Sequence, residues 1–343
     1  MNPTPRARPR ILICDDLAPV AIDTFRLHGL EPDVRTGLRG AALLAAVRDV
    51  DAIVVRSATR VTREVIAAAN ALRVIGRAGI GVDHIDLDAA SARGVAVMNT
   101  PQGNATSAAE LAIALLLAVS RHVARADRAV RAGQWNKGLP MGTEITGKTL
   151  GVIGFGRIGR LVAERGRGLA MQVIAYDPYL DQRTSPVPGV ELLTLDALLA
   201  RADFISVHVA LSASSRNLIS RRELALVKPG ARLIQASRGG VVDEDAVLEA
   251  LESGRLAGAA FDVFATEPVP ADHPLLARDD VVVTPHLGAS SHEAQLRVAV
   301  DIAQQVADFL LKGVAVNVVN AVALAQALRQ APLVAAAPPS ARA

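Results

Sequence analysis

Three polar residues, Arg238, Glu267 and His286, each follow closely on a short segment rich in apolar residues. An arginine guanidinium can hold a carboxylate through two parallel hydrogen bonds. Imidazole titrates near neutral pH, and a neighbouring carboxylate stabilises its protonated form. Such a set can bind an organic acid and move a proton on or off a hydroxyl group. The spacing does not show that Glu267 and His286 meet, so a structural role for His286 and a surface role for Arg238 stay open at this point.

A glycine-rich turn offers a second kind of chemistry. Gly154, Gly156 and Gly159 form the pattern G-x-G-x-x-G between a predicted strand and a predicted helix. The glycines permit a tight turn, let the backbone approach a pyrophosphate and let the helix pack closely on the strand. Asp177 ends the next predicted strand, 18 residues after Gly159, where a carboxylate accepts a hydrogen bond from a ribose 2′-hydroxyl. The pattern indicates NAD rather than NADP, and a purely structural turn is the alternative.

The elements that must position these residues alternate in type along the chain. Stretches rich in Ala and Leu separate short apolar segments, and this alternation predicts parallel sheets covered by helices on both faces. We expect an α/β protein with two doubly wound parallel sheets. The first series of predicted strands covers 11–14, 52–55, 73–75 and 95–98, and the second covers 150–153, 173–176, 204–207, 232–235, 259–262 and 281–284.

Two helices and a tail complete the expected organisation. A long helix is predicted over 105–131, and its centre, 111–119, is apolar on every side. Such a helix is buried, either in a core or in a subunit interface. Another helix is predicted over 291–312, and most of the Ala- and Pro-rich segment 322–343 is expected to be disordered or loosely attached.

Composition excludes several classes of protein. The 343 residues favour two domains, and 37 basic against 34 acidic residues, with no basic run among aromatics, argue against a nucleic-acid partner. The single cysteine, Cys14, cannot form an internal disulfide, and no zinc-ligand spacing occurs, so no metal is expected. The longest apolar run is too short for a membrane span, and the first apolar segment is too short for a secretory leader. We expect a cytoplasmic protein that binds a small anion and no membrane.

Taken together, the motifs resemble the D-isomer-specific 2-hydroxyacid dehydrogenases. The resemblance extends over residues 11–321 and rests on the ordered segments RAGIGVD (77–83), NTPQGN (99–104), GFGRIG (154–159), SRGG (237–240), DVFATEP (262–268) and PHLGAS (285–290). It implies an NAD-dependent oxidoreductase that transfers a hydride between nicotinamide and a D-2-hydroxy acid. Arg238, Glu267 and His286 would be its catalytic residues: Arg238 orients the acid, His286 exchanges the hydroxyl proton, and Glu267 stabilises the imidazolium.

The resemblance also implies an arrangement of domains. A Rossmann dinucleotide-binding domain, 99–289, would be inserted in a flavodoxin-like substrate domain formed by 1–98 and 290–321, and 322–343 would be a tail. Substrate would lie between the domains, and domain closure would exclude water. The long apolar helix would bury a dimer interface, giving a homodimer or tetramer. The implied cofactor-binding residues are Gly154, Gly156, Arg157, Ile158, Gly159, Asp177, Val209, Ala210, Ala236, Asp262, His286, Gly288 and Ala289.

Further segments resemble one branch of this family. VRSAT (55–59), MGTEITGKTL (141–150) and VVNA (318–321) are similar to the branch that oxidises 3-phosphoglycerate to 3-phosphohydroxypyruvate in serine biosynthesis. The implied substrate-binding residues are Arg56, Ser57, Arg77, Ala78, Gly79, Arg238 and His286. Salt bridges at strand ends remain an alternative role for Arg56 and Arg77.

Two departures from the family pattern and three alternatives stand beside this interpretation. Gln235 occupies a position that is usually Asn, near the expected cofactor site, and its effect on nicotinamide affinity is open. The chain has no room for the regulatory domain that many members of the branch carry, so feedback by serine is not expected.

A glyoxylate or hydroxypyruvate reductase, or another D-2-hydroxyacid dehydrogenase, is the main alternative function. A corepressor-like protein that senses NAD(H) is a distant one. A formate dehydrogenase is disfavoured because that branch has Gln where this chain has Glu267.

Overall fold

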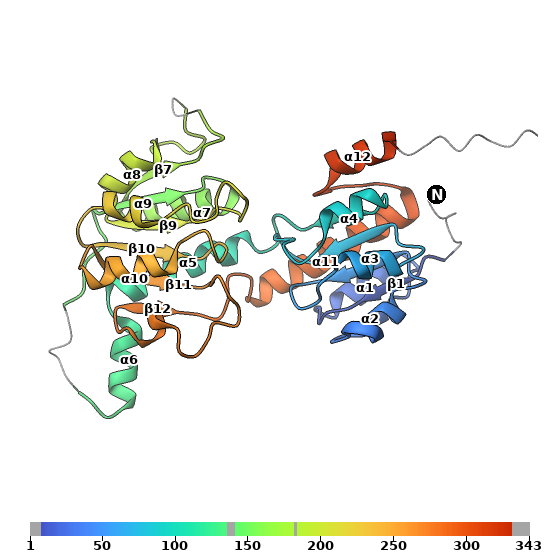
Figure 1. Cartoon of the computed structure of the whole chain (residues 1–343), viewed down its shortest axis with the longest axis horizontal. Coiled ribbons are helices and arrows are strands. Elements are labelled where there is room, and N and C mark those ends of the chain that lie inside the picture. The colour runs from blue at the N-terminus through green and yellow to red at the C-terminus, as the bar shows by residue number, and fades with distance from the viewer. Residues whose placement is uncertain (1–7, 136–140, 182–183, 331–343) are drawn as a thin grey trace, which may run out of the picture. The chain divides into compact units, whose positions relative to one another are not determined.

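The protein is described by a computed structural model that covers residues 8–135, 141–181 and 184–330, and it divides into two compact units (Figure 1). The first unit combines Met1–Gly103 with Gln295–Ala343, and the second is Asn104–Ala294. The divisions after residues 103 and 294 fall five residues beyond those expected after 98 and 289. Each unit is built on its own sheet.

The first unit contains five parallel strands in the order β2-β1-β3-β4-β5, which is the flavodoxin-like order. Successive strand residues point to opposite faces, so Ile11 and Ile13 pack beneath α1 and α11, while Leu12 packs beneath α2, α3 and α4. The strands are β1 (Ile11–Ile13), β2 (Asp33–Val34), β3 (Ala52–Val55), β4 (Val74–Arg77) and β5 (Ala96–Asn99). The helices are α1 (Val20–Leu27), α2 (Gly40–Ala46), α3 (Arg63–Ala68), α4 (Leu87–Ala92), α11 (His292–Lys312) and α12 (Ala321–Gln330).

The second unit contains seven parallel strands in the order β12-β11-β10-β9-β6-β7-β8. The chain reverses direction across the sheet between β6 and β9, as in a Rossmann fold, and such a switch point opens a crevice at the carboxyl ends of the strands. The strands are β6 (Thr149–Ile153), β7 (Gln172–Tyr176), β8 (Glu191–Leu192), β9 (Phe204–Val207), β10 (Ala231–Gln235), β11 (Leu256–Phe261) and β12 (Val281–Val283). The helices are α5 (Ala105–Ser120), α6 (Val123–Arg131), α7 (Arg157–Gly168), α8 (Leu195–Arg201), α9 (Arg221–Leu226), α10 (Glu244–Glu252) and the 3₁₀ helix η1 (Pro274–Ala277).

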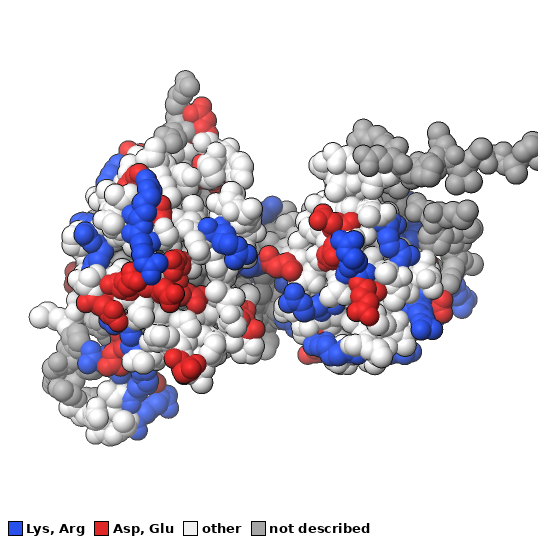
Figure 2. Space-filling view, viewed as in Figure 1, with Lys and Arg blue, Asp and Glu red and all other residues white. Residues whose placement is uncertain are grey.

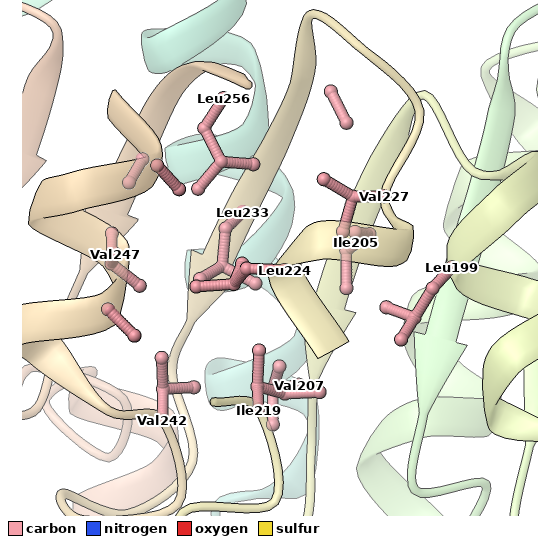
Figure 3. Packing of buried hydrophobic residues seen from close by; sticks show 14 of the residues in the cluster. Leu199, Ile205, Val207, Ile219, Leu224, Val227, Leu233, Val242, Val247 and Leu256 are labelled. Carbon is pink, nitrogen blue, oxygen red and sulfur yellow. The ribbon is translucent and has the colours of Figure 1, made fainter. Parts of the chain in front are cut away.

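Helices cover both faces of the second sheet. Leu224 of α9 and Val247 of α10 pack over Leu233 of β10 (Figure 3). On the opposite face of this sheet, α5 and α7 pack against its strands. These two apolar layers hold the strand ends, and therefore the loops that follow them, in fixed positions.

The long helix expected over 105–131 was a wrong prediction, because α5 and α6 are separate helices that meet at 66°. The carbonyl of Ser120 accepts a hydrogen bond from Thr143 N–H (2.9 Å) and is thereby taken from the helical pattern. His122 then adopts the left-handed conformation, with φ of 53°. Within the described residues, no single helix has the length and hydropathy for a membrane span, and only the bent pair α5–α6 would meet the criteria jointly.

The segment expected to be a loose tail is also in part regular. Residues 322–330 belong to α12, while 331–343 lie outside the described residues. The helix follows Asn320, whose buried side chain accepts a hydrogen bond from Val97 N–H (2.9 Å) and donates to Ser91 and to the Val95 carbonyl. Leu324 packs against the core of the first unit. These polar and apolar contacts order a stretch whose composition alone suggested disorder.

Candidate active site

The loops that carry Arg238, Glu267 and His286 follow β10, β11 and β12, at the carboxyl edge of the second sheet. Nδ1 of His286 lies 2.8 Å from Oε2 of Glu267. The two side chains remain 45% and 38% exposed, so a ligand can reach them. The structure therefore brings together the two side chains whose contact the spacing alone left open.

The Glu267 carboxylate is held in its ionised form. Burial alone would raise its pKa, but the hydrogen bond and charge of His286, the Phe264 N–H group (3.1 Å) and the charge of Arg238 outweigh burial and lower the pKa below its usual value. An ionised carboxylate stabilises a protonated imidazole. Arg238, whose positive charge is among the causes of this lower pKa, is the third catalytic candidate at this edge of the sheet.

Asp262 fixes the loop that presents His286. Its buried carboxylate accepts hydrogen bonds from Thr284 Oγ1 (2.6 Å), Leu287 N–H (2.7 Å) and Gly288 N–H (2.9 Å). The His286 N–H donates to the Asp262 carbonyl (2.8 Å), and His286 itself adopts a left-handed conformation with φ of 56°. The resemblance made Asp262 a cofactor-binding residue, and its contacts within the chain are those of a loop anchor.

The Arg238 loop is held by Gln235, the residue that departs from the family pattern. The Gln235 side chain is buried, donates through Nε2 to the Arg238 carbonyl (2.9 Å) and accepts from Ser237 Oγ (2.8 Å). A Cβ atom at Gly239 would lie 1.8 Å from the carbonyl oxygen of Phe264, so only glycine permits this loop to pack on the Glu267 loop. The backbone around Arg238 thus packs directly on the loop that carries Glu267.

A cavity of about 590 Å³ opens beside the Glu267–His286 pair. Its walls are mainly apolar and include Phe264, Val269, Leu276 and Val283. An apolar wall limits the access of water to a charged pair and strengthens its electrostatic interactions.

The glycine turn forms a cradle at the switch point between β6 and β9. Gly154 has a φ of 87°, and a Cβ atom there would lie 2.6 Å from the carbonyl oxygen of His208. A Cβ atom at Gly159 would lie 2.0 Å from the Gly154 oxygen, whereas one at Gly156 would meet nothing within 4 Å. The backbone at Gly156, the N-cap residue of α7, is therefore open to a ligand, and this geometry fits a dinucleotide pyrophosphate.

The remaining candidate cofactor residues occupy the same edge of the sheet. Asp177 follows β7, and its carboxylate accepts hydrogen bonds from Phe155 N–H (2.9 Å) and Tyr179 N–H (3.0 Å), which anchor it beside the glycine turn. Arg157 and Ile158 are the first residues of α7 and contribute its N-terminal N–H groups. The others follow strands β9, β10 and β12: Val209, Ala210, Ala236, Gly288 and Ala289.

Five of the seven candidate substrate residues lie in the first unit, after β3 and at the end of β4. The Arg56 N–H donates to Asp15 (2.6 Å), whose buried carboxylate also accepts from Thr59 Oγ1 (2.6 Å). The Arg56 guanidinium donates to the Asp16 carbonyl (2.9 Å). Ser57, the next residue, is exposed. Asp15 thus orders the 56–59 loop, a role that its position at the end of the first predicted strand signals in retrospect.

The Arg77 side chain folds back over Gly79, two residues further along the chain. Its guanidinium donates to the Ala78 carbonyl (3.0 Å), and a Cβ atom at Gly79 would lie 1.3 Å from the guanidinium. His84 is affected by both arginines of this set. Burial, followed by the charge of Arg77, lowers the pKa of His84 to about 4, and an interaction with the Arg56 backbone opposes this shift. Sequence reasoning gave His84 no role at the site.

Neither a metal-ligand cluster in the described residues nor, on the face shown in Figure 2, a surface of one charge sign is found. No group of three or more His, Cys, Asp or Glu side chains gathers there with the geometry of a metal site. On the face shown in Figure 2, acidic and basic side chains are interspersed over each unit. Charge on that face therefore gives no sign of an extended basic surface.

Comparison with known protein families identifies the family to which this chain belongs. Residues 113–288 match the model of the D-isomer specific 2-hydroxyacid dehydrogenase NAD binding domain. The chain belongs to the D-isomer-specific 2-hydroxyacid dehydrogenase family. Its second unit is the NAD-binding domain of this family, which confirms the predicted family, the predicted cofactor and the fold of two parallel-sheet domains.

Individual members of the dehydrogenase family match most of the chain. It is 46% identical over 312 residues to D-3-phosphoglycerate dehydrogenase of Archaeoglobus fulgidus, covering 91% of this chain and 59% of the relative. It is 50% identical over 300 residues to the enzyme of that name from Mycobacterium bovis, covering 87% and 56%. The chain thus spans somewhat more than half the length of these relatives. A glyoxylate reductase structure from Paecilomyes thermophila superposes with a TM-score of 0.81 at 30% identity, covering 92% of this chain and 99% of the other.

Proposed function

We propose that the chain is an NAD-dependent dehydrogenase that oxidises 3-phosphoglycerate to 3-phosphohydroxypyruvate, a step of serine biosynthesis. The 2.8 Å contact between Glu267 and His286, on loops of an NAD-binding domain, is the observation that carries the chemical part. The names of the relatives from Archaeoglobus fulgidus and Mycobacterium bovis support the substrate.

Each catalytic side chain has one task in this reaction. Arg238 binds the carboxylate of the acid and fixes C2. Because Nδ1 of His286 faces Glu267, Nε2 is the ring atom that takes the proton from the C2 hydroxyl group, and Glu267 stabilises the imidazolium. NAD, which the glycine turn at 154–159 would hold, would supply the acceptor for the hydride that leaves C2 as the carbonyl forms. In the reverse direction the protonated His286 is the acid.

The residues of the first unit supply recognition of the substrate anion in this proposal. Arg56 and Arg77 would bind the phosphate, with Ser57 and the N–H groups of Ala78 and Gly79 as further donors. Asp15 and His84 hold this set in place without themselves contacting substrate. His84 stays neutral near pH 7, since its pKa is about 4, and so adds no charge to the two arginines.

The proposal is tested by measuring kcat/KM for a panel of phosphorylated and unphosphorylated 2-hydroxy acids, each with NAD and with NADP. We expect the phosphorylated acid and NAD to be preferred. In Arg56→Ala, kcat/KM should fall for 3-phosphoglycerate and change little for an unphosphorylated acid. An equal effect on both classes would remove the proposed role of Arg56 in phosphate binding.

Reduction of glyoxylate or hydroxypyruvate is the second candidate, because the Paecilomyes thermophila structure that superposes on this chain is named a glyoxylate reductase. The two candidates are separated by assaying glyoxylate, hydroxypyruvate and 3-phosphohydroxypyruvate in the reducing direction with NADH and NADPH. A higher kcat/KM for glyoxylate or hydroxypyruvate than for 3-phosphohydroxypyruvate, unchanged in Arg56→Ala, would support this candidate over the first.

We propose further that the protein works in the cytoplasm as a homodimer or tetramer. The one cysteine, Cys14, is buried, and burial raises its pKa to about 12, which suits a chain without disulfides in a reducing compartment. Apolar side chains of Leu117 on α5 and of Val123 and Val130 on α6 are exposed. Burying them in a second copy would supply the apolar core of an interface, and light scattering on the purified protein tests the assembly.

A further inference from the structure

A second glutamate–histidine pair lies in the second unit, beside the loop that carries Glu267. Glu244 is the first residue of α10, and its Oε2 lies 3.1 Å from Nε2 of His273. Both side chains are largely buried, with 14% and 19% exposed. The edge of the Phe264 ring packs on the His273 ring, with 5.5 Å between centroids. None of the motifs behind the proposed function includes this pair.

The hydrogen bonds of His273 define which nitrogen carries the proton. Nδ1 of His273 accepts from the N–H group of Leu275 (3.3 Å). A neutral ring with an acceptor at Nδ1 has its proton on Nε2, which therefore donates to Glu244. The ring thus orients one oxygen of the Glu244 carboxylate and leaves the other, Oε1, free to accept from another donor.

That other oxygen binds the backbone of the loop that carries Glu267. Oε1 of Glu244 accepts a hydrogen bond from the N–H group of Ala265 (2.6 Å). The preceding N–H group, that of Phe264, donates to Oε1 of Glu267 (3.1 Å). The N–H groups of two consecutive residues therefore donate to two different carboxylates: that of Phe264 to the catalytic Glu267, and that of Ala265 to Glu244. Any shift of Ala265 would also shift the donor that holds Glu267 against His286.

We propose that Glu244, oriented by His273, is a positioning residue for the Glu267–His286 pair. This inference rests on the proposed function, since it assigns an indirect role at the same site. Glu244 acts through the Ala265 and Phe264 backbone. Loss of its carboxylate frees two hydrogen-bond donors and lets the 264–267 loop relax, so that Glu267 no longer holds the imidazole in one orientation.

The experiment uses the full chain with four variants. Glu244→Ala removes both hydrogen bonds, and His273→Leu removes the ring that orients Glu244. His273→Gln keeps a donor near the position of Nε2 and is the conservative variant. Glu249→Ala is the matched control, since Glu249 lies on the same helix but pairs with Arg221 at the surface (2.5 Å). For each we would measure kcat, KM for the acid, the Kd for NADH, Tm and the pH profile of kcat/KM.

We expect Glu244→Ala to lower kcat by roughly 10- to 100-fold, the range expected of a small misplacement of reacting groups. The Kd for NADH should change less than about threefold, and the fall of kcat/KM on the acid side should move to lower pH, because a displaced Glu267 stabilises the imidazolium less. His273→Leu should act in the same direction, and His273→Gln should restore most of the activity. Glu249→Ala should match the wild type.

Two results would count against this inference in different ways. If Glu244→Ala and His273→Leu lower Tm but keep the wild-type kcat and pH profile, the pair is only structural and the inference is wrong. Should Glu244→Ala fail to fold, the comparison of His273→Leu with His273→Gln decides on the same readouts. His286→Ala is assayed in parallel: if it keeps the wild-type kcat, the proposed function fails first, whereas its inactivity beside unaltered Glu244 and His273 variants overturns the positioning role alone.

Discussion

His286 and Glu267 meet through Nδ1 and Oε2 at 2.8 Å, although 18 residues separate them along the chain. The contact is possible because each residue follows one of two adjacent parallel strands, β12 and β11, whose carboxyl ends share an edge. The carboxylate uses one oxygen for the imidazole and the other for Phe264 N–H. This division of its two oxygens sets the tautomer of the ring and leaves Nε2 toward a substrate.

Replacing Glu267 by Gln should therefore do more than remove a charge. The amide oxygen would be drawn to the Phe264 N–H donor, and the amide NH₂ would face Nδ1 of His286. The ring would then carry its proton on Nε2 and could not accept one from substrate. We expect kcat to fall by on the order of 10²–10⁴-fold with little change in the Kd for NADH. Stopped-flow and steady-state kinetics check this, and a kcat within threefold of the wild type would contradict the assigned tautomer.

Gln235→Ala should weaken the handling of the acid rather than of the cofactor. The buried side chain holds the Ser237–Arg238 segment through both of its polar atoms, and Ala leaves the Arg238 carbonyl and the buried Ser237 hydroxyl without that partner. Such losses cost roughly 1–3 kcal/mol. We expect a higher KM for the acid, a lower Tm and an unchanged Kd for NADH. A variant whose only defect is weaker NADH binding would show instead that Gln235 serves the nicotinamide.

Asp177→Ser should relax the preference for NAD. The carboxylate lies at the end of β7 beside the glycine turn, where it would accept from a ribose hydroxyl and repel a 2′-phosphate. A charge-assisted hydrogen bond contributes about 1.5–3 kcal/mol, so the ratio of kcat/KM with NAD to kcat/KM with NADP should fall by roughly tenfold or more. Glu191→Ser, which changes an exposed acid paired with Arg201, is the control. An unchanged ratio in Asp177→Ser would remove the ribose role.

Stability should fall on the acid side of neutral pH through His208. Burial lowers the pKa of His208 to about 4, against 6.5 for the free side chain. Between these two pH values the unfolded chain binds a proton at His208 and the folded chain does not. Between pH 6.5 and about 4 this histidine costs roughly 1.4 kcal/mol of stability for each pH unit, and below pH 4 its contribution is constant. His208→Asn should flatten this part of the Tm–pH curve in calorimetry. Parallel curves for both proteins would show that His208 titrates normally.

Much of the fold could be predicted because parallel sheets follow from local pattern. The segments 11–14, 52–55 and 150–153 are apolar and bounded by turns, and each forms a strand close to its predicted limits. The two-residue strands β2 and β8 lacked such a pattern, since each pairs along only one side at the edge of its sheet. The break between α5 and α6 depends on Thr143, 23 residues after Ser120, and no local pattern near residue 120 signals it.

The candidate site, like the fold, could be predicted from the sequence only in part. Residue type and strand-end position pointed to Arg238, Glu267 and His286, because their chemistry can be read from each residue alone. The residues that hold them could not be found this way. Asp262, Gln235 and Glu244 act through hydrogen bonds to backbone groups, and such contacts exist only once the loops are folded. Asp262 and Gln235 had been noted for the cofactor site, and Glu244 not at all, so the structure was needed to show that these residues hold the loops in position.

The most direct test of the account is the rate of NAD reduction with 3-phosphoglycerate by the wild type and by His286→Ala. We predict turnover by the wild type and a kcat lower by at least about 10²-fold in the variant, with an unchanged Kd for NADH. Near-normal turnover by His286→Ala would contradict the assignment of His286 as the acid–base residue.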